Sequence, residues 1–184
     1  STLACIYGGI KEISQFYSNL KLSQLTNKIK EFVLNKGVDD NHFIKYIGTS
    51  EVDSSLLWLS IPFGLVKPDE KLMLNTVEII EKDLLKEGVY RYKQDTYYGG
   101  GEWILLTAWL GWYYTEIGER SKAYNLLKWI ESKADKDGNL PEQININVLN
   151  LKFYNNWFRK KGKSAKTLLW SHAMYIILKK ALEN

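Results

Sequence analysis

Apolar residues recur at intervals of three and four along most of this chain, which is the spacing of one face of an α-helix. The alternation of polar and apolar residues that marks a half-buried strand is short-lived, and only three prolines interrupt the helical pattern. We therefore predict an all-α protein with about seven helices. They are expected over residues 3–20, 23–34, 54–63, 68–85, 103–117, 119–134 and 165–182.

The predicted helices alternate between two kinds. Segment 103–117 is apolar nearly all round, whereas segment 119–134 carries one apolar stripe and an opposite charged face. A helix that is apolar on all sides must be covered on all sides, while a helix with one stripe lies on the outside. The alternation predicts inner and outer helices, as in an α/α toroid. A simpler bundle or solenoid is the alternative, because the repeats share no clear sequence identity.

Composition narrows the class of protein further. With 184 residues, 45% of them apolar and 25% charged, the chain is predicted to form one globular domain over residues 1–184. The net charge of +4 comes without a long basic run, which argues against nucleic-acid binding. Cys5 is the only cysteine and the chain has two histidines, so we expect no metal, no cofactor and a cytoplasmic location. No apolar run reaches the ~18 residues of a membrane span.

Two long loops, 86–102 and 135–164, hold the residues with chemical potential, and loops of this length are usually functional. The first loop combines one arginine, carboxylates, a glycine run and many aromatic rings, and the second contains Leu140-Pro141-Glu142-Gln143. A sugar presents C–H faces that lie against aromatic rings, and hydroxyls that need fixed polar partners. The loops therefore predict carbohydrate chemistry. Trp103, which directly follows three glycines, is expected to face the ligand.

A known family has the same motifs in the same order. The run Arg91-Tyr92-x-x-Asp95-x-Tyr97-Tyr98-x-Gly100-x-x-Trp103 is followed by the Leu-Pro-Glu-Gln segment at 140–143 and by Trp170-Ser171-His172. Segment 53–57 also matches a family segment. Together they resemble the C-terminal half of the catalytic domain of glucoamylases and related glycoside hydrolases of family 15.

The resemblance implies a fold and a reaction. Residues 1–184 would be the C-terminal part of an (α/α)6 barrel that cleaves α-glucosidic bonds with inversion, in gluco-oligosaccharides or trehalose. Glu142 would be the general base that deprotonates the attacking water. On residue pattern alone, a glutamate after Pro141 in a polar loop is more typical of an ordinary solvated turn residue, and only the resemblance favours the general base.

The resemblance also implies substrate-binding residues. Arg91 would bind sugar hydroxyls, and Trp103 and Trp170 would wall the pocket, with Asp95 and Tyr97 supporting them. Two further positions carry open interpretations. Glu102 stands where family members often differ, and His172 is either a substrate group or a satisfied core residue.

The family's general acid lies in a Trp-Glu-Glu type motif upstream of the first helix, and this chain contains no such motif. General acid–base contributions are each worth about 10²–10⁴-fold, so the chain is expected to be inactive alone. A fragment, a subunit of a split enzyme and a non-catalytic relative are the three explanations. The expected partners are the N-terminal half of the same enzyme or a second copy. The alternative function is a non-catalytic domain that binds carbohydrate or protein.

Overall fold

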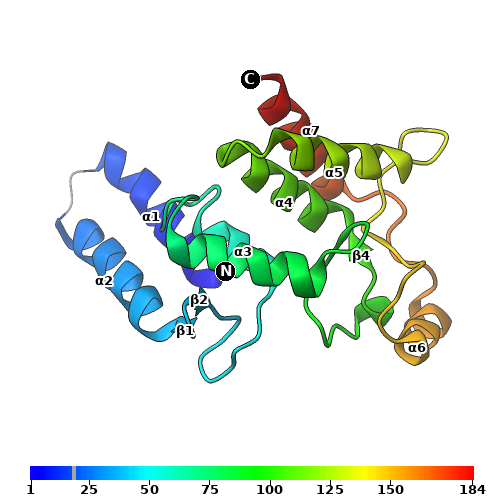
Figure 1. Ribbon diagram of the computed structural model, residues 1–184, viewed down its shortest axis with the longest axis horizontal. Coiled ribbons are helices and arrows are strands. Elements are labelled where there is room, and N and C mark those ends of the chain that lie inside the picture. Colours follow the sequence, from blue (N-terminus) through cyan, green and yellow to red (C-terminus); the bar gives the residue numbers. More distant parts are fainter. Residues whose placement is uncertain (18–19) are drawn as a thin grey trace. The chain divides into compact units, whose positions relative to one another are not determined.

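The computed structural model describes residues 1–17 and 20–184, which form two compact units, Ser1–Ile80 and Glu81–Asn184 (Figure 1). Helices dominate both units, as the periodicity predicts. No helix among the described residues is both long and apolar enough to cross a membrane.

The first unit is built on two packed helices, a short hairpin and a 3-10 helix. Its elements are α1 (Thr2–Phe16), α2 (Leu20–Lys36), β1 (Val38–Asp39), β2 (His42–Phe43), η1 (Ser54–Leu59) and the start of α3 (Lys71–Leu84). Phe43, Leu57, Leu65 and Met73 are fully buried in its core. The backbone N–H of Phe43 also donates to Thr76 Oγ1 at 2.9 Å, which ties the hairpin to α3.

Two predicted helices of this unit need correction. The segment 54–63 is a 3-10 helix over Ser54–Leu59 and not an α-helix. Its side-chain cap is Asp53, and Pro62 prevents an extension because proline lacks an N–H and disfavours helical backbone before it. The predicted helix 3–20 ends at Phe16, and α2 begins at Leu20. Residues 18 and 19 of that prediction lie outside the described residues.

The second unit is organised around α4 (Ile104–Glu116), which packs against α5 (Arg120–Ser132) and α7 (Leu169–Glu183) (Figure 1). Ten of the thirteen residues of α4 are buried, so the prediction of an inner helix is confirmed. Helix α5 buries one stripe, formed by Ala123, Leu126, Leu127 and Ile130, as the apolar stripe of its sequence predicts; Ala134, which also belongs to that stripe in the sequence, lies beyond the helix and is only partly buried. Helix α4 is thus covered on most sides and α5 on one side, because apolar residues surround the first and form a single stripe on the second.

A small antiparallel sheet, which the sequence analysis did not predict, connects the loops of this unit. Its strands are β3 (Val89–Tyr90), β4 (Glu102–Trp103) and β5 (Gln143–Ile144), in the order β3-β4-β5. Each strand has two residues, too few for an alternation to be recognised. Trp103 therefore lies in a strand, and the helix expected from residue 103 begins at Ile104.

The prediction that residues 135–164 form a loop is wrong in one part, because this segment contains helix α6 (Leu151–Lys161). Asn150 caps this helix by accepting hydrogen bonds from the backbone N–H groups of Lys152 and Phe153, at 3.0 and 3.3 Å. Gly162, with a φ of 77°, ends it. The last helix accordingly starts at Leu169 rather than at residue 165.

Helices α1 and α7 each expose large apolar side chains, as expected for the first and last helices of an incomplete ring. On α1 these are Ile6, Ile13 and Phe16, and on α7 they are Leu169, Trp170, Ile176 and Ile177. Among these, Phe16 and Leu169 are the most exposed, at 82% and 83%.

The turn that enters β3 gives the first testable prediction. A Cβ at Gly88 would overlap the ring of Trp129, which packs over this turn. Gly88→Ala should therefore lower the free energy of unfolding by about 1–3 kcal/mol, measured from urea unfolding followed by circular dichroism. Gly9→Ala is the control, because a Cβ there meets nothing within 4 Å and Gly9 lies inside a helix. Equal stability of the Gly88 variant and the wild type would contradict the packing of Trp129 on this turn.

Candidate active site

The three-stranded sheet positions the residues that the sequence analysis singled out. Val89 pairs with Trp103, and Trp103 pairs in turn with Gln143, so the three strands join the two long loops across β4. Arg91 directly follows β3 and Glu142 directly precedes β5. The sheet therefore brings segments from both long loops to one place.

Arg91 and Asp95 form a two-point ion pair in the first of these loops. Arg91 Nε donates to Asp95 Oδ2 at 2.9 Å, and Nη2 donates to Oδ1 at 2.5 Å. The Asp95 side chain is 1% exposed and that of Arg91 34%, so the carboxylate is buried beneath a partly open guanidinium. Asp95 Oδ1 also accepts the backbone N–H of Tyr97 at 3.0 Å. One buried carboxylate thus orients Arg91 and the start of the aromatic turn.

An aromatic cluster surrounds the guanidinium of Arg91. Its Cζ lies 4.9 Å from the ring centre of Tyr92, 5.8 Å from that of Tyr97 and 5.2 Å from that of Trp103. The rings of Tyr97 and Trp103 stack at 5.8 Å with planes 26° apart. These cation–π and stacking contacts fix the arginine against flat apolar faces. The cluster thus combines a partly exposed guanidinium with the flat faces of aromatic rings.

Tyr97 joins this cluster to Glu142. Its hydroxyl donates to the carboxylate of Glu142, at 3.2 Å from Oε2 and 3.4 Å from Oε1. Burial, and then the negative charge of Glu142, raise the pKa of Tyr97 to about 12. The phenol therefore keeps its proton and remains a donor across the physiological pH range.

The proton affinity of Glu142 results from opposed effects. Burial raises the pKa of its carboxyl above the ordinary value, while the hydrogen bond from Tyr97, the backbone of Ala165 and the charge of Arg91 lower it. Burial is the largest of these effects, so the pKa is raised overall. A half-buried carboxylate with raised proton affinity is well suited to accept a proton from water.

The backbone of the Glu142 segment is held by α7 and the residues just before it. Leu168 N–H donates to Leu140 O at 3.0 Å, and Leu140 N–H donates to His172 Nε2 at 3.1 Å. Ser171 Oγ donates to Pro141 O at 2.8 Å. Glu142 N–H donates to Ala165 O at 2.9 Å. The position of Glu142 is therefore fixed by hydrogen bonds on both of the residues before it.

His172 and Ser171 play supporting parts in this arrangement. Because His172 Nε2 accepts an N–H, its ring is engaged with the loop backbone. This contact gives the ring a hydrogen-bond partner within the protein. Ser171 is fully buried beneath the loop, and the sequence analysis attached no role to it.

The remaining predicted residues occupy different positions. Trp103 is 8% exposed and lies beneath Arg91 and Tyr97, so it backs these two side chains. Glu102 is buried, and its Oε1 accepts the N–H groups of Gly88 and Glu87 at 2.8 and 3.2 Å. Its carboxylate thus caps the turn before β3. Trp170 is 47% exposed on α7, with its ring edge-on to Trp109 at 5.5 Å.

The structure adds residues that the sequence analysis missed. Trp157 of α6 makes ring contacts with Tyr97 and Tyr98, at 5.0 and 5.4 Å between centres. The signal was present, because Leu151, Tyr154, Trp157 and Phe158 follow the three-and-four spacing of an amphipathic helix. Gln143 is also buried; its Oε1 accepts Gly101 N–H at 2.9 Å, whereas its Nε2 has no hydrogen-bond partner.

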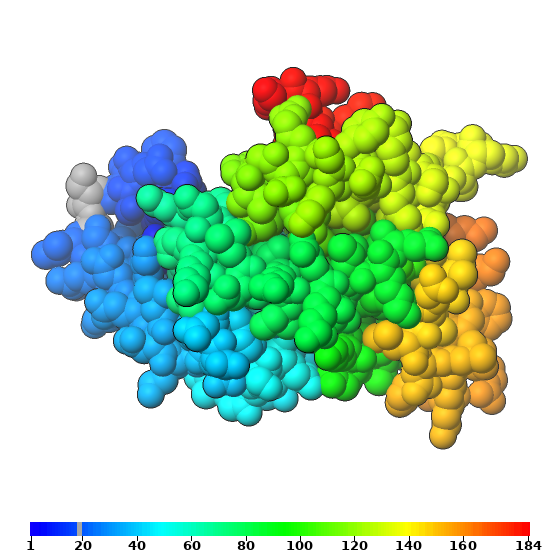
Figure 2. All heavy atoms as spheres, viewed as in Figure 1, coloured from blue at the N-terminus to red at the C-terminus, as the bar shows by residue number. Residues whose placement is uncertain are grey.

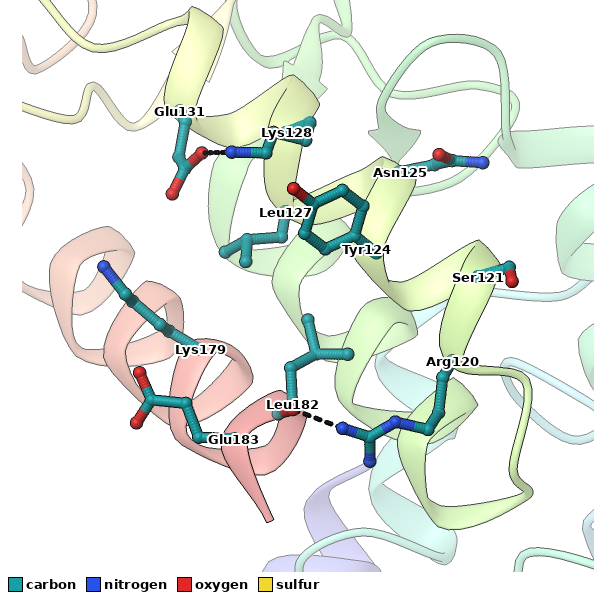
Figure 3. A pocket seen from close by; sticks show the side chains of 10 residues that line it. All are labelled: Arg120, Ser121, Tyr124, Asn125, Leu127, Lys128, Glu131, Lys179, Leu182 and Glu183. Carbon is teal, nitrogen blue, oxygen red and sulfur yellow. Dashed lines mark hydrogen bonds and ion pairs between the residues drawn. The ribbon is translucent and has the colours of Figure 1, made fainter.

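A separate hollow of about 640 Å³ lies between α5 and the end of α7 (Figure 3). Several of its charged groups have partners: Lys128 Nζ lies 2.9 Å from Glu131 Oε2, and Arg120 is bonded to the carbonyl of Leu182. It contains none of the predicted site residues. Within residues 1–17 and 20–184, no cluster of three or more His, Cys, Asp or Glu side chains is arranged to hold a metal ion.

The contact between Tyr97 and Glu142 gives the second prediction. Tyr97→Phe removes a donor that favours the ionised carboxylate, so the pKa of Glu142 should rise further. Carboxyl 13C shifts of labelled glutamate, followed through a pH titration, report this change directly. Tyr98→Phe is the matched control, because the Tyr98 hydroxyl donates to Lys163 O instead. A Glu142 midpoint that stays in place in the Tyr97 variant would show that the hydrogen bond is not formed in solution.

Known proteins resemble this chain in both sequence and structure. The chain is 41% identical over 186 aligned residues to isomaltose glucohydrolase from Kribbella flavida, across 97% of this chain and 48% of that protein. Trehalase 2 from Sulfolobus acidocaldarius is 36% identical over 106 residues, or 55% of this chain and 18% of the trehalase. A solved glycosidase structure superposes with a TM-score of 0.95 at 39% identity, over 99% of this chain and 51% of that one.

These relatives are glycoside hydrolases, and this chain spans about half the length of the first of them. The predicted fold class is confirmed: the chain has part of the helical (α/α)6 fold of the glucoamylase type. The family described as "Glycosyl hydrolases family 15" matches residues 3–135. The chain therefore belongs to glycosyl hydrolase family 15, as its motifs indicate.

Proposed function

We propose that this chain supplies the general base of an inverting glycoside hydrolase and that the base is Glu142. One observation carries the proposal: a half-buried carboxylate of raised pKa accepts a hydrogen bond from Tyr97 beside the Arg91 guanidinium. Family membership supports the reaction class.

In the proposed reaction, a water oxygen attacks the anomeric carbon of an α-glucoside while Glu142 takes a proton from that water. The bond from the anomeric carbon to the glycosidic oxygen breaks, and a second carboxylic acid protonates the departing oxygen. In an inverting pair the two carboxyl groups lie about 6.5–9.5 Å apart, which leaves room for the water. Attack from the face opposite the leaving group would release β-glucose.

Arg91 is proposed to bind sugar hydroxyls, because its guanidinium is 34% exposed and held rigid by Asp95. Tyr97 and Trp103 would hold it in place. We assign His172 and Glu102 to positioning the loops, because both side chains are bonded to backbone groups. Trp170 is proposed as a wall of the pocket because about half of its surface is open.

The proposed substrates are gluco-oligosaccharides with α-linkages, or trehalose. The isomaltose glucohydrolase and trehalase names of the relatives support both choices. The single cysteine supports a cytoplasmic location.

Residues 1–184 are proposed to be the C-terminal part of an (α/α)6 catalytic domain, completed by an N-terminal half that carries the acid. The exposed apolar side chains of α1 and of α7 support a missing partner. So does the coverage of about half of the relatives. This half would reside on the same polypeptide or on a second one.

The third prediction tests the base. In the active protein, meaning this chain together with the half that carries the acid, Glu142→Gln keeps the shape but cannot accept a proton. The value of kcat should fall by roughly 10²–10⁴ with KM little changed, measured on maltose, isomaltose and trehalose. Glu116→Gln, which changes a carboxylate that accepts from Trp112, should leave kcat unchanged. Full activity of the Glu142 variant, or α-glucose as the first anomer that NMR detects when glucose is released from the non-reducing end of maltotriose, would refute the proposed base or the inversion.

The fourth prediction tests the partner. The chain alone should not hydrolyse maltose, maltooligosaccharides or trehalose, and adding the N-terminal half should restore hydrolysis. Ile13→Glu places a charge on the exposed apolar face of α1 and should weaken the association at least tenfold in sedimentation experiments. Glu12→Lys, on the same helix, is the control for a change of charge alone. A chain that hydrolyses these sugars unaided, or that associates with neither itself nor the other half, would contradict the proposal.

A further inference from the structure

Helix α6 contributes one aromatic ring to the candidate site. Trp157 meets the ring of Tyr97 edge-on, with centres 5.0 Å apart and planes at 68°. It stacks on Tyr98 at 5.4 Å with planes 29° apart. On another side Tyr97 stacks with Trp103, so its phenol ring lies between contacts from two separate elements. The hydroxyl of this confined ring is the group that donates to Glu142.

Backbone contacts fix α6 on the turn that carries Tyr97. The N–H groups of Leu149 and Asn150 donate to the carbonyls of Gly100 and Gly99, at 3.1 and 2.9 Å. A Cβ on Gly99 would lie 2.7 Å from Asn150 O and 2.8 Å from Tyr154 Cβ, so the two chain segments touch backbone to backbone. In Figure 2 the orange surface of α6 lies against the green surface of the residues that precede α4.

The turn beneath α6 has an unusual backbone that needs outside support. Tyr98 has a φ of 47°, in the left-handed region that a tyrosine adopts at a cost, and Gly99 and Gly100 continue it at 75° and 71°. The Tyr98 ring is 5% exposed, and its hydroxyl donates to Lys163 O at 3.4 Å. Stacking by Trp157 therefore holds Tyr98 in the conformation that directs the preceding residue, Tyr97.

We propose that Trp157 is a positioning residue, whose ring holds the Tyr97 hydroxyl on the carboxylate of Glu142 and so keeps the general base oriented and ionised. The inference rests on the proposed function of Glu142. If Trp157 served only to dock α6, its loss would weaken packing and nothing more. The proposed role predicts in addition a change in the proton affinity of Glu142, which loss of packing elsewhere on the helix would not produce.

The sign of the effect follows from the hydrogen bond. A donor favours the ionised form of Glu142, so loss of the donor makes the carboxylate easier to protonate. The base works only when ionised. The acid limb of the pH profile of kcat/KM should therefore move to higher pH when Trp157 is removed.

The experiment compares variants of the active protein defined above. Trp157→Ala should shift the acid limb to higher pH and lower kcat roughly three- to tenfold, with KM changed less than twofold. Trp157→Phe keeps a ring against both tyrosines and should recover most of the loss. Phe158→Ala is the matched control: Phe158 is 44% exposed on the same helix and its ring contacts Tyr154. It should leave the profile unchanged.

A double variant tests whether Trp157 acts through Tyr97. In the Tyr97→Phe background the hydroxyl is absent, so Trp157→Ala should cause no further shift of the acid limb. Equal shifts in both backgrounds, or a loss of kcat without any shift, would overturn the inference. If Trp157→Ala does not fold, as judged by circular dichroism, Trp157→Leu, which keeps apolar volume but has no ring, replaces it in both backgrounds under the same criterion.

Carboxyl 13C titration of Glu142 separates this inference from the proposed function, because it needs no activity. If Trp157→Ala raises the midpoint of Glu142 while Glu142→Gln remains active, the positioning contact is real and the assignment of the base is wrong. If Glu142→Gln is inactive but Trp157→Ala leaves the midpoint in place, the base is right and the role of Trp157 is refuted.

Discussion

The buried carboxylate of Asp95 is the constraint on which the rest of the candidate site depends. With its side chain 1% exposed, it is stable only if its oxygens are paired, and Arg91 together with the backbone of Tyr97 pairs them. Through these bonds Asp95 sets the direction of the guanidinium and the start of the aromatic turn. The stack of Tyr97 on Trp103 and the contact of Tyr97 with Glu142 follow from that placement.

The pKa of Glu142 results from burial, which raises it, and from neighbouring groups that lower it. Burial alone would favour the neutral carboxylic acid, because the neutral form has no charge that must be removed from water. The Tyr97 hydroxyl, the Ala165 backbone and the charge of Arg91 oppose it, each from a different segment of the second unit. The backbone before Glu142 is bonded at both Leu140 and Pro141, which keeps the carboxylate beside these groups.

The sequence predicted the parts of the structure that repeat over many residues. Helix α4 was recognisable because it is apolar on every side, and α5 because it has a single stripe. The sheet was not recognisable, because two-residue strands form through contacts between distant loops and leave no periodic pattern. Helix α6 has helical spacing, but it lies inside a segment whose motif and length are typical of a functional loop, so the spacing did not set it apart. The helix predicted over residues 54–63 is shorter because of Pro62. The effect of a proline on a helix is local and can be predicted from the sequence.

The candidate site shows a similar division. Arg91, Asp95, Tyr97, Trp103 and Glu142 were selected from the motifs, and the structure brings them into one connected set. The interpretation of Glu102 and His172 required the structure, because a hydrogen bond to a distant backbone group cannot be deduced from residue type. Glu102 reaches Gly88 and Glu87 across a strand pair, and His172 reaches Leu140 from α7.

The order of these elements along the chain has a consequence for how the site is assembled. Every motif residue from Arg91 to Gln143 precedes the segments that hold Glu142 in position. The bonds from Ala165, Leu168, Ser171 and His172, and the ring of Trp157, all come from later residues. A polypeptide that ended after Gln143 would keep the motif from Arg91 to Gln143, with the Tyr97 hydroxyl among it, and lose the bonds that hold the backbone of residues 140–142. The backbone that carries Glu142 is therefore complete in its contacts only when the segment before α7 and α7 itself have packed onto the preceding loops.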